Sequence, residues 1–162
     1  MRALKIFGAL CVCATALACE ARDSVGVVCQ SISNETASVR GDTVITTTGL
    51  RYRDLEVGSG LMARPCRGVT IRTVGRLQNG AVFDSTFTGE AGAFVPGLKV
   101  LPVRGVEEGV LGMLEGGKRR LIIPPSLAYG SEARKAEAGS GFADIPANST
   151  LIYDIELLQT VP

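Results

Sequence analysis

Apolar and polar residues alternate along three segments of the chain, a pattern typical of half-buried β-strands. The segments are residues 50–57, 69–74 and 151–157. Because successive side chains of a strand point to opposite faces, each segment should bury one face and expose the other. In the second and third segments the residues expected to face inward are Val69, Ile71, Thr73, Leu151, Tyr153, Ile155 and Leu157.

Turn residues indicate further strands. Asn79-Gly80 favours a two-residue β-hairpin turn, in which both positions take positive φ. Residues 81–84 should therefore return antiparallel to the preceding strand. Residues 118–123 form another expected strand, ended by Pro124-Pro125, and residues 43–47 have the composition of an additional edge strand.

One helix is predicted, over residues 103–114. Glu107 and Glu108 lie in its first turn, where carboxylates suit the helix dipole, and Gly116-Gly117 should stop it. Many strands and one short helix predict an α+β fold, in which a curved antiparallel β-sheet wraps around the helix. The residues that the helical spacing gathers on one face are Val106, Val110 and Met113.

The composition excludes several classes of catalytic site and of binding partner. A chain of 162 residues has the length of one domain, and its 20 glycines and 7 prolines favour a turn-rich β fold. It contains no His and no Trp, so the commonest general base and the commonest zinc ligand are missing. We therefore expect no metal, no cofactor and no Ser-His or Cys-His catalysis. The net charge is +1 without a basic cluster, so we expect no nucleic-acid partner.

Residues 1–18 have the three parts of a secretory signal peptide. Arg2 and Lys5 form a positive start, residues 6–17 are an apolar run too short to span a bilayer, and small residues precede Cys19. A buried N-terminal helix is the alternative.

Leu17-Ala18-Cys19 resembles a bacterial lipoprotein box, in which Cys19 is lipidated and becomes the first residue of the mature chain. Ala16 stands where that pattern usually has Leu, and ordinary cleavage after Ala18 would expose the same site, so both alternatives remain open. Glu20 would favour the outer membrane over the inner one. The resemblance implies an outer-membrane lipoprotein that faces the periplasm, with a soluble periplasmic or secreted protein as the alternative.

Residues 19–47 are mostly small and polar, and we interpret them as a flexible tether. Two cysteines leave with the signal peptide and lipidation would occupy Cys19. Cys29 and Cys66 then remain, and they either form a disulfide or stay two separate thiols.

Four motifs, in order, resemble the FKBP-type peptidyl-prolyl cis–trans isomerases. The run GGKRRLIIPPSLAYG at residues 116–130 is similar to the family signature. With residues 48–52, which resemble the strand that opens bacterial members, the resemblance covers residues 48–158. The other motifs are Phe83-Asp84-Ser85 after the hairpin, Gly105-x-Glu107-Glu108-Gly109 on the helix, and LIYDIELL at residues 151–158.

The resemblance implies an isomerase domain over residues 48–162, exported and acting without covalent chemistry. Rotation about an X-Pro bond has a barrier of about 20 kcal/mol because the amide must lose its conjugation. A dry pocket favours the twisted, less polar amide without any titrating base. The absence of His agrees with such a mechanism.

Carried over by position, the resemblance assigns catalytic roles to Asp84, Tyr129 and Phe83. Asp84 would place negative charge near the substrate carbonyl carbon, Tyr129 would donate from its hydroxyl, and Phe83 would form an aromatic wall. The alternatives are plain core for Phe83 and Tyr153, and a turn for Asp84-Ser85. The substrate-binding positions are Val103, which also offers its backbone N–H, and Val106, Ile145, Tyr153 and Thr73.

The chain departs from the family pattern at two pocket positions. Thr73 stands where a tyrosine is usual, and Val106 stands where the family carries Trp. Residues 131–143 also form a longer loop than usual, and the pattern does not say whether Phe94 restores a pocket aromatic. These departures predict a wider, less apolar pocket with slow isomerisation and weak macrolide binding.

Two functions remain in competition. The first is an enzyme that assists the folding of exported proteins and acts on proline-containing polypeptides. The second is a chaperone or binding module with weak or no isomerase activity. In either case we expect a monomer that meets the membrane only through a lipid anchor, because the tether is too short and polar to be a dimerisation region.

Overall fold

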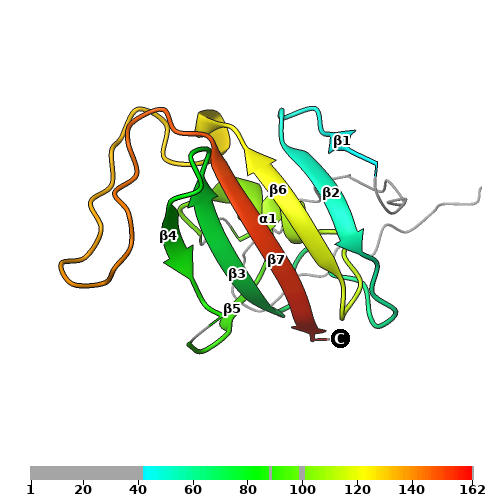
Figure 1. Ribbon diagram of the computed structural model, residues 1–162. Helices are drawn as coiled ribbons and strands as arrows, with labels where there is room; N and C mark the ends of the chain where they lie inside the picture. Colours follow the sequence, from blue (N-terminus) through cyan, green and yellow to red (C-terminus); the bar gives the residue numbers. More distant parts are fainter. Residues whose placement is uncertain (1–41, 88, 99–100, 162) are drawn as a thin grey trace, which may run out of the picture.

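The structure is a computed structural model that describes residues 42–87, 89–98 and 101–161. Seven antiparallel strands form one curved sheet in the order β1-β2-β6-β7-β3-β4, with β5 also paired to β3. A short α-helix lies against one face of this sheet (Figure 1). The strands are β1 (Val44–Ile45), β2 (Arg51–Glu56), β3 (Val69–Leu77), β4 (Val82–Ser85), β5 (Gly92–Phe94), β6 (Lys118–Ile123) and β7 (Leu151–Thr160), and the helices are α1 (Arg104–Val110) and the 3₁₀ helix η1 (Pro125–Leu127).

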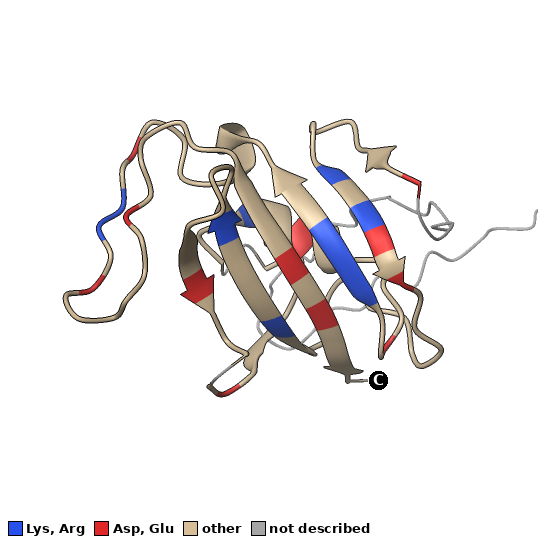
Figure 2. Cartoon of the chain, viewed as in Figure 1, with Lys and Arg blue, Asp and Glu red and all other residues tan. Residues whose placement is uncertain are grey.

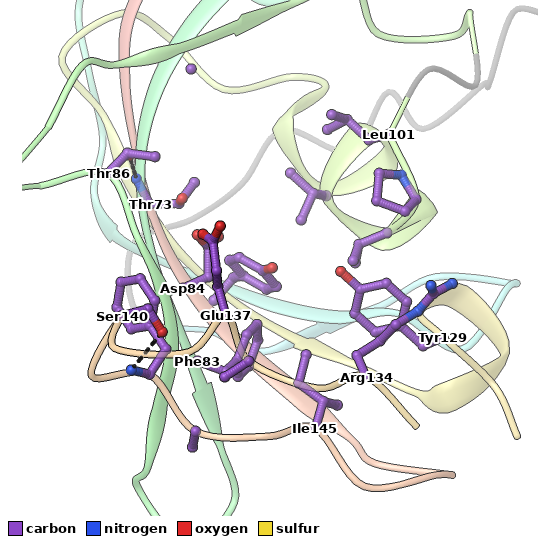
Figure 3. Close-up of a pocket in the computed structure, with 18 of the residues that line it drawn as sticks. Thr73, Phe83, Asp84, Thr86, Leu101, Tyr129, Arg134, Glu137, Ser140 and Ile145 are labelled. Atoms are coloured by element: carbon purple, nitrogen blue, oxygen red, sulfur yellow. Dashed lines mark hydrogen bonds between the residues drawn. The ribbon is translucent and has the colours of Figure 1, made fainter. Parts of the chain in front are cut away.

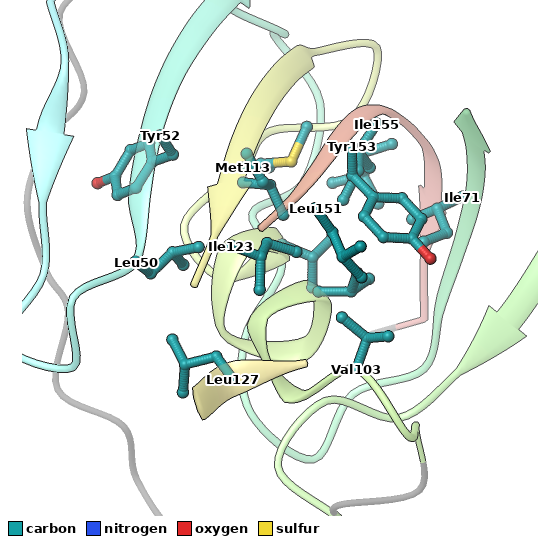
Figure 4. Close-up of a cluster of buried hydrophobic side chains, with 14 of the residues drawn as sticks. Leu50, Tyr52, Ile71, Val103, Met113, Ile123, Leu127, Leu151, Tyr153 and Ile155 are labelled. Atoms are coloured by element: carbon teal, nitrogen blue, oxygen red, sulfur yellow. The ribbon is translucent and has the colours of Figure 1, made fainter. Parts of the chain in front are cut away.

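The inner face of the sheet and helix α1 share one hydrophobic core (Figure 4). The predicted alternation is confirmed for β3 and β7, which bury every second residue along most of their length. It holds only in part for residues 50–57, where Asp54 is buried by its pair with Arg119 while Val57 is exposed. Leu121, Leu151 and Leu157 are fully buried in the core. The inward-facing residues predicted from the pattern are all buried: Val69, Ile71, Thr73, Leu151, Tyr153, Ile155 and Leu157.

Helix α1 is shorter than the predicted range of 103–114. It ends at Val110, Leu111 is extended, and Gly112 has a φ of 75°. The chain leaves the helix here because Met113 pairs with the preceding loop, where the Ala63 N–H donates to the Met113 carbonyl at 2.8 Å. Met113 is nevertheless buried, as its spacing predicted.

The prediction that Gly116-Gly117 stops the helix is wrong. The Gly117 N–H donates to the Leu114 carbonyl at 2.9 Å, and Gly116 has a φ of 81°, so this pair forms the turn into β6. The two glutamates of the helix are both buried. Glu108 accepts the Thr48 hydroxyl at 2.7 and 2.9 Å.

The hairpin between β3 and β4 is confirmed, but its turn differs from the predicted one. Only Gly80 has positive φ, at 87°, whereas Asn79 does not. The Gly80 N–H donates to the Leu77 carbonyl and the Leu77 N–H to the Ala81 carbonyl, both at 2.9 Å. This is a three-residue loop, in which one left-handed residue follows a tight turn. The Asn79 side chain accepts the Ala81 N–H at 3.0 Å. This hydrogen bond favours the three-residue loop over the two-residue turn.

The predicted edge strand within residues 43–47 is confirmed as β1, which pairs with β2. The folded sheet therefore includes the end of the segment interpreted as a tether. The predicted signal peptide, Cys19 and Cys29 lie outside the described residues. Cys66 is disulfide-bonded, and its partner also lies outside them. Neither helix in the described part of the chain is long and apolar enough to cross a bilayer.

The outer face of the sheet is charged (Figure 2). Asp154 on β7 accepts hydrogen bonds from Arg120 on β6 at 2.6 Å and from Arg76 on β3 at 2.8 Å. These pairs join three neighbouring strands on the side away from the core.

Candidate active site

A cavity of about 660 Å³ lies between one side of the sheet and the start of helix α1 (Figure 3). Ligand pockets in proteins usually measure roughly 300–1,000 Å³, so this cavity has the size for a small ligand or a few residues of peptide. It brings together every predicted catalytic and substrate-binding residue: Thr73, Phe83, Asp84, Val103, Val106, Tyr129, Ile145 and Tyr153.

Phe83 and Asp84 are consecutive strand residues, yet both line the cavity. Regular alternation would send their side chains to opposite faces. Asp84 pairs with Gly75 and Val82 pairs with Arg76, which leaves Phe83 between them without a partner on β3. A β-bulge of this kind re-aims a side chain, and it explains how two adjacent residues serve one pocket.

Gly75 gives the aromatic rings room to pack. A Cβ atom there would lie 2.6 Å from Cε2 of Phe83 and 3.1 Å from Cε1 of Tyr153. The two rings meet edge to face, with centroids 5.5 Å apart and an interplanar angle of 81°. The Tyr153 hydroxyl also lies close enough to the Asp84 carboxylate to lower the pKa of that acid.

The opposite wall comes from the start of helix α1. Val103 and Val106 are both buried, and the loop before them is held by the buried carboxylate of Glu107. Glu107 accepts the Leu101 N–H at 2.7 Å and the Gly97 N–H at 3.3 Å. The Val103 N–H has no hydrogen-bond acceptor within the part of the chain that the structure describes.

Residues 131–148 form a long flap (Figure 1), and residues of this flap line a third side of the cavity. Arg134 and Ile145 exchange two backbone hydrogen bonds of 2.8 Å, and this pair sets the base of the flap. The Ala143 N–H donates to the Val82 carbonyl at 2.9 Å, which ties the flap to β4. Tyr129 lies just before the flap and lines the cavity with it.

Burial dominates the electrostatics of the site. It raises the pKa of Asp84 above its usual value, against the opposing effect of hydrogen bonds from the Tyr153 hydroxyl and the Ser85 N–H. Burial also raises the pKa of Tyr129, where the Arg134 charge opposes the shift and the Asp84 charge adds to it. Burial, followed by the Asp84 charge, raises the pKa of Tyr153. Both tyrosines therefore stay protonated and can donate hydrogen bonds at neutral pH.

The sequence interpretation missed part of the lining. Ile71 lies two residues before Thr73 on the same strand face, so alternation alone could have placed it in the site. Phe94 belongs to a three-residue strand, β5, too short to carry a periodic signal. Phe94 lines the cavity, so it does supply an aromatic ring to the pocket, which the sequence pattern did not decide. The other missed residues are Thr86, Leu101, Pro102 and the flap residues Arg134, Lys135, Ala136, Glu137, Ser140, Phe142 and Ala143, with Gly92 and Ala93 of β5.

The arrangement can bind an apolar ring and orient its polar neighbours. It offers aromatic and aliphatic walls, two tyrosine hydroxyls and one carboxylate. Within the described residues, no cluster of three or more His, Cys, Asp or Glu side chains is placed to hold a metal ion.

Residues 62–158 match the family described as FKBP-type peptidyl-prolyl cis-trans isomerase. FK506-binding protein 4 of Neurospora crassa is 44% identical over 117 residues, which are 72% of this chain and 23% of that protein. FK506-binding protein 3 of Candida albicans is 42% identical over 111 residues, 68% of this chain and 24% of that protein. The chain thus spans about a quarter of the length of these curated relatives.

Solved structures show the same fold. AtFKBP13 is 34% identical with a TM-score of 0.64, and the match covers 74% of this chain and 99% of that one. FkpA from Escherichia coli is 36% identical with a TM-score of 0.60, covering 74% of this chain and 52% of that one. Because the family match covers more than half of the sequence, the chain belongs to the FKBP-type peptidyl-prolyl cis–trans isomerase family.

Proposed function

We propose that this protein is a peptidyl-prolyl cis–trans isomerase that accelerates X-Pro isomerisation in exported polypeptides. The observation that carries the proposal is the convergence of Phe83, Asp84 and Tyr129 on one largely apolar cavity, from two separate parts of the chain. Such a cavity can take a proline ring against its walls and orient the flanking carbonyls with a few fixed donors.

In this mechanism the proline ring packs between Phe83, Tyr153 and Val106. The Val103 N–H and the Tyr129 hydroxyl donate to substrate carbonyls, and the Asp84 carboxylate faces the carbonyl carbon of the rotating amide. The twisted amide is less polar than the planar one, so a dry site lowers the rotation barrier of about 20 kcal/mol. No group of the protein needs to gain or lose a proton.

The test is the isomerisation rate of a panel of X-Pro peptides with wild-type protein and with the double variant Asp84→Ala, Tyr129→Phe. We expect clear acceleration by the wild type and a loss of about ten-fold or more in kcat/KM in the variant. The control is Asp42→Ala with Tyr52→Phe, which changes the same residue types outside the cavity. A folded wild-type protein that accelerates no peptide would contradict the proposal.

A wider pocket is a second part of the proposal. Thr73 and Val106 are small for the family, and both line the cavity. They should slow turnover, alter the preference for the residue before proline and weaken macrolide binding. Thr73→Tyr combined with Val106→Trp should raise both turnover and macrolide affinity. If both quantities stay unchanged, the width of the pocket does not limit them.

The same two small residues favour a competing function, an FKBP-fold chaperone or binding module with little isomerase activity. Such a module would hold apolar segments in the cavity without speeding their rotation. The peptide assay separates the two functions, because a module would bind the peptides without changing their exchange rate.

We also propose export with a lipid anchor at Cys19 and a monomeric state. Support comes from the signal-like pattern of residues 1–18 and from the disulfide at Cys66, since disulfides persist in oxidising compartments. The curated relatives named above are fungal and give this part no support. Mass spectrometry of the mature N-terminus in wild type and in Cys19→Ala tests the anchor, and sedimentation of the protein tests the monomer.

The partner of Cys66 is proposed to be Cys29. A thiol titration of the denatured, unreduced mature protein should find neither thiol free. Two free thiols would contradict this pairing.

A further inference from the structure

Arg134 of the flap lies over the ring of Tyr129. Its guanidinium carbon is 5.0 Å from the ring centroid, within the distance of about 6 Å over which a cation is attracted to an aromatic face. Both residues line the cavity. Figure 3 shows them together on one side of it, with Asp84 on the other side.

Arg134 is anchored through its backbone, and its guanidinium has one further partner. Its backbone exchanges two hydrogen bonds of 2.8 Å with Ile145, and its Nη2 is 2.8 Å from an oxygen of Glu132. The neighbouring flap cation, Lys135, also lines the cavity, but its side chain is 86% exposed, against 52% for Arg134, and its ammonium pairs with Asp144. Arg134 is therefore the flap cation that is placed against a predicted substrate donor.

We propose that Arg134 is a positioning residue for Tyr129, which fixes the ring by stacking on its face and makes the hydroxyl a stronger donor to the substrate carbonyl. The catalytic part of this inference rests on the proposed isomerase function. The contact itself does not, and it can be measured on the protein without substrate.

The charges around the phenol agree with this role. Burial and the Asp84 carboxylate raise the pKa of Tyr129, while the Arg134 guanidinium acts in the opposite direction. A phenol that binds its proton less tightly is the better hydrogen-bond donor. Arg134 thus opposes part of the rise in the pKa of Tyr129 that burial and the Asp84 charge cause.

The first measurement is an ultraviolet titration of the tyrosines in the full chain. The chain has three tyrosines and no Trp, so their ionisation is easily observed, and Tyr129→Phe identifies the signal of Tyr129. Arg134→Met should raise the pKa of Tyr129, and Arg134→Lys, which keeps the charge, should raise it less. Arg72→Met, which removes an exposed cation of β3 outside the cavity, should leave it unchanged.

The second measurement is kcat/KM on an X-Pro peptide. Arg134→Met should lower kcat/KM by about two- to five-fold in the wild-type background, and it should cause no further loss in the Tyr129→Phe background. A wild-type pKa and kcat/KM in Arg134→Met would overturn the inference. An equal loss in both backgrounds would also overturn it, because Arg134 would then act independently of the hydroxyl.

The two proposals fail separately. A wild-type protein without isomerase activity would contradict the proposed function, while a raised pKa of Tyr129 in Arg134→Met would still support the positioning of Tyr129. Activity without that rise in pKa would leave the isomerase proposal standing and remove the role of Arg134.

Discussion

Asp84 combines two requirements that conflict at the level of a single residue. The proposed mechanism needs an ionised carboxylate, but burial raises the pKa of this group and so disfavours the charge. The Tyr153 hydroxyl and the Ser85 N–H relieve only part of that cost. Asp84 should therefore reduce the stability of the fold while it serves the site.

Replacement of Asp84 by Asn should separate these two effects. A carboxyl whose folded pKa is raised binds its proton more tightly in the folded state, so ionisation at about pH 7 destabilises the fold. Asp84→Asn should then raise Tm at neutral pH and lower kcat/KM, and its stability advantage should shrink as the pH falls and the wild-type carboxyl protonates. Thermal unfolding followed by circular dichroism over a pH series measures this. A lower Tm for the variant at neutral pH would contradict it.

At the scale of elements, helix α1 approaches β6 through two glycines. A Cβ atom on Gly109 would lie 2.4 Å from Cδ1 of Leu121, and one on Gly105 would lie 2.4 Å from Cγ2 of Ile123. The glycines let the helix pack against the sheet closely enough to set Val103 and Val106 at the cavity.

Gly109→Ala should therefore destabilise the protein by about 1–3 kcal/mol, because the added methyl group overpacks the interface of helix and sheet. Urea unfolding provides the measurement. The matched control is Gly89→Ala, where a Cβ atom would meet nothing within 4 Å, and this variant should leave the midpoint unchanged. Equal midpoints for Gly109→Ala and wild type would mean that the interface can relax.

A buried ion pair joins β2 to β6. Arg119 donates to both oxygens of Asp54, at 2.5 and 3.1 Å, and also to the carbonyls of Gly109 and Leu111 at the end of helix α1. The two side chains are 2% and 7% exposed. Arg119 thus links two strands and the helix terminus through one guanidinium.

Asp54→Asn should destabilise the fold by about 3 kcal/mol, because it leaves the buried guanidinium without its countercharge. The control is Glu56→Gln on the same strand, whose pair with Lys118 is exposed and should contribute little. Unfolding by guanidinium chloride compares the two variants. If they unfold at the same midpoint, the buried pair does not hold the two strands together.

The sequence predicted the elements better than it predicted their ends. Alternation located β3 and β7 because each buries one face along its length. The end of helix α1 could not be predicted, since it is set by pairing of Met113 with Ala63, a loop distant in sequence. The bulge at Phe83 was likewise hidden, because it depends on the register between β3 and β4.

At the scale of the whole molecule, the site is made where the curved sheet, the start of helix α1 and the flap meet. The family resemblance placed all the predicted residues at this meeting point, but it could not place the flap, which is longer than the family pattern. Only the structure therefore shows that Arg134 and Phe142 line the site.

The most direct test of the central claim is the refolding of a protein whose slow phase is limited by X-Pro isomerisation. The protein is added at a small fraction of the refolding chain's concentration, as wild type and as Asp84→Ala, Tyr129→Phe. We expect the slow phase to speed up in proportion to the wild-type concentration and to remain unchanged with the variant. A higher yield of folded product with an unchanged slow phase would contradict the claim and identify a binding module instead.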